Sequence, residues 1–202
     1  MSTDLNLKVA REAATLLYFG AEKEYKQAKL RAAKTLGTHF LPSNLDIALE
    51  LDIIAEQNEG ANRRERLIQM RKEALRIMKL LSAFCPVLIG SVWRGNIRQG
   101  SDIDVAVYVD YPEVIVKTLK IGDVRVLKTA WTTVNKAGAT LASFHIYAET
   151  STKYGLEIVV RNQDEAGKKR KCEIFGDEIK GLNIKELQKV LIYNPTQQFI
   201  PS

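Results

Sequence analysis

Two short stretches decide the fold of this chain: Leu88-Ile89-Gly90-Ser91-Val92-Trp93-Arg94-Gly95 and Gly100-Ser101-Asp102-Ile103-Asp104-Val105-Ala106-Val107. Each contains a run of aliphatic residues that is typical of a buried strand. The first run ends at a Gly-Ser pair, the second begins with two alternating aspartates, and ten residues separate Ser91 from Asp102. The pattern predicts strand, turn and strand, with polar groups gathered where the strands meet the turn.

The Gly-Ser pair suits a turn that binds an anion. Gly90 has no Cβ, so the backbone can turn there and approach a ligand closely. Ser91 stands where a helix could begin, which would direct its hydroxyl and free backbone N–H groups toward a phosphate. We therefore expect Gly90 and Ser91 to contact a nucleotide.

The two aspartates indicate a divalent metal. Residues two apart on a strand point to the same face, so Asp102 and Asp104 should project together. Two carboxylates this close repel each other unless a cation lies between them, and hard oxygen ligands combined with phosphates favour Mg²⁺ or Mn²⁺. A site with two such ions usually needs a third carboxylate.

The third carboxylate should come from another strand. Glu157 interrupts the apolar stretch 155–160, where burying an acid without a role would be costly. An acid on a solvent-facing edge, or a partner for Arg161, is the alternative explanation of Glu157. Glu149, at the end of the apolar stretch 143–149, is the second candidate for the metal site.

Gly90-Ser91, ten residues and then Asp102-Ile103-Asp104 together resemble the signature of the DNA polymerase beta-like nucleotidyltransferase superfamily, most closely its minimal prokaryotic and archaeal members. The resemblance covers residues 86–161. It implies that the Gly-Ser turn holds a triphosphate and that Asp102, Asp104 and Glu157 are catalytic metal ligands. It also implies transfer of a nucleoside monophosphate, with ATP the expected donor, to a hydroxyl or phosphate on a protein, RNA or small molecule. The alternative is a non-catalytic nucleotide sensor or interaction module that retains the fold.

Further side chains near these motifs are candidates for binding. Arg94 follows Ser91 by three residues, and a guanidinium can bind a phosphate through two parallel hydrogen bonds. Ser101, directly before Asp102, is placed in the same nucleotide site. His145 is interpreted as a hydrogen-bonded core histidine or as a group that orients a nucleotide or acceptor hydroxyl. The basic run Lys168–Lys171 is interpreted as a solvated loop or as a phosphate contact beside the site.

The rest of the chain predicts an α+β fold, with about five strands in one mixed sheet and helices packed on it. Residues 1–60 are expected to form a helical region and residues 61–202 the nucleotidyltransferase-type core with a C-terminal helix. The helical region could cover a sheet face, form a homodimer or dock a substrate. The expected helices span 4–19, 21–36, 45–57, 63–83, 112–120 and 184–193, and the expected strands 87–89, 102–109, 124–134, 140–148 and 155–160. Residues 197–202 are expected to trail over the surface.

Composition adds little about the partner. The net charge of +6 is modest, and no apolar run approaches the length of a membrane span. The two cysteines lack the spacing of a metal site, so reduced thiols are expected. We therefore expect a soluble cytoplasmic protein with no membrane contact.

Overall fold

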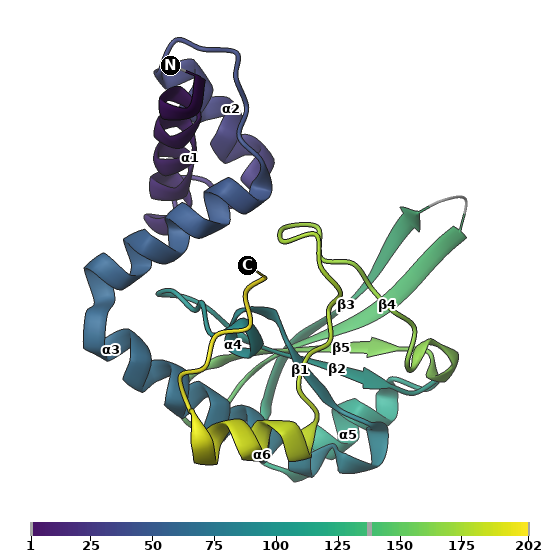
Figure 1. Cartoon of the computed structure of the whole chain (residues 1–202). Helices are drawn as coiled ribbons and strands as arrows, with labels where there is room; N and C mark the ends of the chain where they lie inside the picture. Colours follow the sequence, from purple (N-terminus) through teal and green to yellow (C-terminus); the bar gives the residue numbers. More distant parts are fainter. Residues whose placement is uncertain (1, 137–138, 202) are drawn as a thin grey trace.

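A five-stranded mixed sheet forms the centre of the computed structural model, which describes residues 2–136 and 139–201 (Figure 1). The strands lie in the order β1 (Val87–Ile89), β2 (Ile103–Tyr108), β5 (Gly155–Arg161), β4 (Ala139–Glu149) and β3 (Arg125–Lys136). Strands β2 and β5 are parallel, and the other neighbouring pairs are antiparallel. The predicted fold class is confirmed. The expected hairpin connection at 135–138 includes Ala137 and Gly138, which lie outside the described residues.

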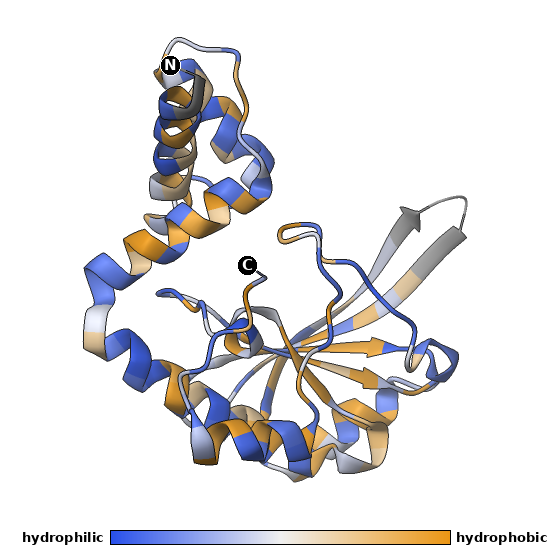
Figure 2. Ribbon diagram, in the orientation of Figure 1, coloured by the Kyte–Doolittle hydropathy of each residue, from blue (hydrophilic) through white to orange (hydrophobic). Residues whose placement is uncertain are grey.

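The two faces of the sheet differ in chemistry. On one face, the aliphatic residues of the central strands pack against the second half of α3 (Asn44–Leu80), α5 (Glu113–Ile121) and α6 (Ile184–Tyr193) (Figures 1 and 2). Because side chains alternate along a strand, Asp104 and Glu157 project from the opposite face. The buried face consists of Ile103, Val105, Val107, Leu156, Ile158 and Val160.

The helices before the sheet have a hydrophobic core of their own. Helices α1 (Ser2–Tyr18) and α2 (Tyr25–Thr35) pack with the first half of α3, and small alanine side chains allow the helices to approach closely. Figure 1 shows this helical region standing away from the sheet, with α3 connecting the two. Its core residues are Val9, Ala10, Ala13, Ala14, Leu17, Ala28, Ala32, Ala33, Ile47 and Ile54.

Helix α3 has a break at Gly60, where φ is 50° and ψ is −128°. The sequence predicts two helices on either side of this residue, whereas the structure shows one helix that changes direction there. Arg63, which is buried just after the break, donates from Nε to the carbonyl of Ile97 at 2.6 Å. It also forms ion pairs with Asp52 and Glu56 of the first half. The angle between the two halves is therefore held by side chains from both.

The expectation that the last residues trail over the surface is wrong for the part that the structure describes. The guanidinium of Arg71 is fully buried and donates to the carbonyls of Pro195 and Gln197, both at 2.8 Å. The N–H of Phe199 donates to the carbonyl of Arg94 at 2.9 Å. A buried guanidinium needs acceptors, and the C-terminal segment supplies them. Across the described residues, no helix has both the length and the apolar character needed to cross a membrane.

Candidate active site

Two glycines make room for the two aspartates. A Cβ on Gly90, where φ is +70°, would lie 1.9 Å from Oδ2 of Asp104. A Cβ on Gly155 would lie 2.0 Å from Oδ1 of Asp102. Both distances are far inside van der Waals contact, so each carboxylate occupies space that a side chain would otherwise fill. The glycine of the Gly-Ser pair therefore positions a carboxylate as well as turning the chain.

Strand register places Glu157 next to this pair. Asp104 lies opposite Ile89 on β1 and opposite Glu157 on β5, and Glu157 in turn lies opposite Tyr147 on β4. Directly opposite residues in neighbouring strands project from the same face. The structure thus brings Asp104 and Glu157 together on one face.

Glu149 has a different environment. It lies opposite Gly155 on β5 and Arg125 on β3, and its carboxylate is 3.5 Å from Nζ of Lys153 and 3.6 Å from the guanidinium of Arg125. Two cations therefore already balance Glu149. The geometry favours Glu157 as the third carboxylate.

The carboxylates repel one another. Burial, together with the smaller effects of the charges of Glu157 and Asp102, raises the pKa of Asp104 to about 8. Partial burial, followed by the charge of Glu157, also raises the pKa of Asp102. Both shifts mean that the ionised forms lack a compensating positive charge, which a cation would supply.

The site fits a hard divalent cation that is bound together with phosphates. Within residues 2–136 and 139–201, no group of three or more His, Cys, Asp or Glu side chains is arranged to hold a metal ion by protein ligands alone. Mg²⁺ commonly takes one or two carboxylates and completes its shell with water and substrate phosphates. Asp102 and Asp104, held over the glycines, match that requirement.

His145 is hydrogen-bonded to the carboxylate of Glu157. Its Nδ1 lies 2.6 Å from Oε1 of Glu157, and its Nε2 lies 2.8 Å from Oγ of Ser143. All three side chains are partly buried on the face that carries Asp104. His145 is thus hydrogen-bonded, as one of its two interpretations expected, and its position fixes the orientation of Glu157.

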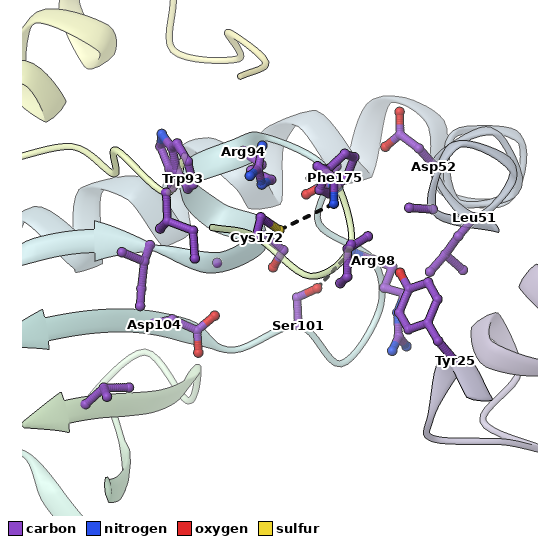
Figure 3. A pocket seen from close by; sticks show the side chains of 18 residues that line it. Tyr25, Leu51, Asp52, Trp93, Arg94, Arg98, Ser101, Asp104, Cys172 and Phe175 are labelled. Atoms are coloured by element: carbon purple, nitrogen blue, oxygen red, sulfur yellow. Dashed lines mark hydrogen bonds between the residues drawn. The ribbon is translucent and has the colours of Figure 1, made fainter. Parts of the chain in front are cut away.

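A cavity of about 330 Å³ adjoins Gly90, Ser91 and Asp104 (Figure 3). Tyr25 and Leu51 form a wall from the helical region, so α2 and α3 take part in the site. The Oδ1 atom of Asn96, another lining residue, is buried without a hydrogen-bond partner among the residues that the structure describes. Other lining residues are Asp52, Trp93, Ser101, Val159, Cys172, Ile174 and Phe175.

Arg94 also lines the cavity, but most of its contacts are with the C-terminal part of the chain. Its guanidinium is 4% exposed and binds both carboxylate oxygens of Asp177, at 2.6 and 3.2 Å, and the carbonyl of Phe199 at 2.9 Å. It also lies between the rings of Trp93 and Phe175, at 4.4 and 4.3 Å from their centroids. Arg94 therefore joins the Gly-Ser turn to the C-terminal segments through both of its Nη atoms.

Arg98 is better placed to contact a phosphate. It lines the cavity with Ser91, Ser101 and Tyr25, and its charge acts on the Tyr25 hydroxyl; no side-chain hydrogen bond or ion pair of Arg98 is found in the described part of the chain. Oγ of Ser101 accepts from the backbone N–H of Arg98 at 2.9 Å, which fixes the turn that carries the guanidinium. Arg98 lies inside the ten-residue spacer, where the sequence motif gives no signal for it.

Comparisons with known proteins give weak similarities. No protein-family model and no curated protein matches the chain. Three solved structures resemble it with a TM-score of 0.32 each. A cytoplasmic RNA terminal U-transferase is 17% identical, and the match covers 59% of this chain and 35% of that chain. The Cid1 poly(U) polymerase in a form bound to MgATP is 15% identical, with coverage of 48% and 33%. A GLD-2/RNP-8 complex is 11% identical, with coverage of 60% and 40%. The matched part thus spans 33% to 40% of those chains.

Proposed function

We propose that this protein is a metal-dependent nucleotidyltransferase, which transfers a nucleoside monophosphate from a nucleoside triphosphate to an acceptor and releases pyrophosphate. The observation that carries the proposal is the pair of aspartates seated over Gly90 and Gly155. Each carboxylate fills the space of a missing Cβ, and Asp104 does so beside the Gly-Ser turn, where it lines a ligand-sized cavity. A structural turn would not require this arrangement.

The side chains divide into two groups by chemistry. Ser91, Ser101 and Arg98 line the cavity and would offer hydroxyl and guanidinium donors to the phosphates. Asp102, Asp104 and Glu157 would hold Mg²⁺ or Mn²⁺. When bound, the metal would neutralise charge on the phosphates and stabilise the departing pyrophosphate. His145 keeps the Glu157 carboxylate oriented through its Nδ1.

The cavity suits a nucleoside. Its volume of about 330 Å³ is at the lower end of small-molecule sites. ATP is the donor expected from the sequence motif, and AMP is therefore the proposed transferred group.

One observation favours the sensor alternative. Glu157 is hydrogen-bonded to His145. If Glu157 stayed hydrogen-bonded to His145 while Ser91 and Asp104 bound a nucleotide, Glu157 would not serve as a metal ligand. The protein would then bind the nucleotide as a sensor and would not catalyse transfer. The acceptor of a catalytic form is a hydroxyl or phosphate on a protein, RNA or small molecule.

The test is to incubate the full chain with each α-labelled nucleoside triphosphate, Mg²⁺ or Mn²⁺ and cell extract, and to follow label transfer and pyrophosphate together. Asp104→Asn should abolish both signals, whereas Asp164→Asn, at an exposed position, should leave both unchanged. Triphosphate binding by calorimetry without label or pyrophosphate would replace the transferase with the sensor. Equal turnover by the wild type and Asp104→Asn would contradict the assignment of the site.

A further inference from the structure

The cavity beside the Gly-Ser turn lies between two parts of the chain that have separate hydrophobic cores. The core of the helical region and the core beneath the sheet share no residue. Tyr25 of α2 and Leu51 of α3 are partly buried against the helical core, and both also line the cavity. Ala48, which is buried and belongs to neither core cluster, lines it from α3 as well. Tyr25, Ala48 and Leu51 together are called the helical wall.

The helical wall lies away from the carboxylates. Figure 3 shows Asp104 on one side of the cavity and Tyr25 and Leu51 on the opposite side, with Ser101 and Arg98 between them. The cavity therefore passes from groups that suit a metal and phosphates to a surface formed by an aromatic ring and aliphatic side chains.

The two ends of a nucleoside triphosphate need different surroundings. Phosphates need cations and hydrogen-bond donors, and burying them against aliphatic side chains would be costly. A nucleobase is flat and aromatic, and it packs well on an aromatic ring. The helical wall offers the ring of Tyr25 beside the aliphatic Ala48 and Leu51, so it fits the base and not the phosphates.

The helical wall and the groups for phosphate meet at Tyr25 and Arg98. Burial raises the pKa of the Tyr25 phenol, and the positive charge of Arg98 opposes this by a smaller amount. The phenol is therefore neutral at pH 7, and the guanidinium lies close enough to act on it. A base on Tyr25 would thus lie next to a cation that can hold the phosphates.

We propose that the helical wall binds the nucleobase of the triphosphate, so that a nucleotide joins the helical region to the sheet. The inference rests on the proposed function, because it concerns the donor substrate of that site. Phosphates on Ser91, Ser101 and Arg98 would contact only the part of the chain that contains the sheet. A base on Tyr25 and Leu51 would contact the helical region as well. ATP should therefore restrain α2, whereas inorganic tripolyphosphate should not.

Binding is tested by calorimetry of the full chain with Mg²⁺ and two probes, ATP and inorganic tripolyphosphate. Tyr25→Ala should weaken binding of ATP by about tenfold, a typical loss when a base loses its aromatic partner, and should leave binding of tripolyphosphate unchanged. Tyr25→Phe keeps the ring and should bind ATP like the wild type. The matched control is Tyr111→Ala, at a position that is 75% exposed and outside the cavity, which should change neither affinity.

A second variant tests the helical wall without removing a side chain that packs against the helical core. Ala48→Leu adds bulk at a lining position outside both core clusters, so it should weaken binding of ATP and leave tripolyphosphate unchanged. Wild-type affinity for ATP in both Tyr25→Ala and Ala48→Leu would overturn the proposal. Equal losses of ATP and tripolyphosphate would also overturn it, because the phosphates alone would then account for the change.

Amide hydrogen exchange measures the link between the two parts of the chain. In the wild type, ATP should slow exchange in α2, and tripolyphosphate should not. Equal protection by the two probes, or none by ATP, would contradict the proposal. Pyrophosphate release is followed separately. Its absence with every acceptor, together with protection of α2 by ATP, would remove the transferase and keep the nucleobase site. Release by Tyr25→Ala with an unchanged KM for ATP would keep the transferase and overturn the nucleobase site.

Discussion

Asp104→Asn should stabilise the metal-free protein at alkaline pH while it abolishes transfer. Burial and the neighbouring carboxylates raise the pKa of Asp104 from its ordinary 3.8 to about 8. A carboxyl group whose pKa is raised in the folded state contributes stability at low pH that is lost as the pH rises through this interval. At about 1.4 kcal/mol per pKa unit, the interval from pH 5 to pH 8 corresponds to roughly 4 kcal/mol of unfolding free energy. Asparagine has nearly the same shape and no charge, so the variant should lack this loss.

The assay is urea unfolding at pH 5, 7 and 9 in the presence of EDTA, followed by circular dichroism. The free energy of unfolding of the wild type should fall by roughly 4 kcal/mol more than that of Asp104→Asn between the lowest and highest pH. Asp4→Asn, at an exposed position on α1, should behave like the wild type. Addition of Mg²⁺ at pH 9 should recover stability in the wild type and not in Asp104→Asn. Parallel pH profiles of the wild type and Asp104→Asn would refute the reasoning, because they would show that Asp104 ionises in the fold without cost.

Three further substitutions test the surroundings of the site. Gly155→Ala should reduce pyrophosphate release by about a hundredfold, because the new Cβ would displace the Asp102 carboxylate from its position 2.0 Å away; wild-type rates would show that this carboxylate is not needed there. Arg71→Met should lower the free energy of unfolding by roughly 3 kcal/mol, since buried carbonyls lose their donor; a change below about 1 kcal/mol in urea unfolding would contradict that role. His145→Gln should lower kcat by about tenfold, with unchanged unfolding, if its contact with Glu157 orients the carboxylate; an unchanged kcat would limit His145 to packing.

The sequence was informative where one strand or one turn decides the geometry. The alternation of apolar residues around Asp104 and around Glu157 predicts that each carboxylate sits in a strand, and the observed register brings the two together. The break at Gly60 was also visible, because glycine separates two apolar patterns.

Contacts between distant segments could not be predicted. The role of Arg94 depends on Asp177, which is 83 residues further along the chain. The position of Arg94 three residues after Ser91 does not show that Asp177 packs against the Gly-Ser turn. The sequence around Arg98 likewise does not show that its guanidinium lines the cavity, because this depends on which residues from other segments surround it. A side chain's free donors are known only when all of its potential acceptors have been located.

The break in α3 gives the helical region a mechanical role. Tyr25 and Leu51 close one side of the nucleotide cavity, yet they are joined to the sheet through the backbone at Gly60, a residue with helix on either side. The ion pairs of Arg63 with Asp52 and Glu56 hold the two halves of α3 at this angle, and Asp52 also lines the cavity. The angle at Gly60 therefore sets how far this wall stands from the Gly-Ser turn, whereas the sheet alone fixes the register of Asp104 and Glu157.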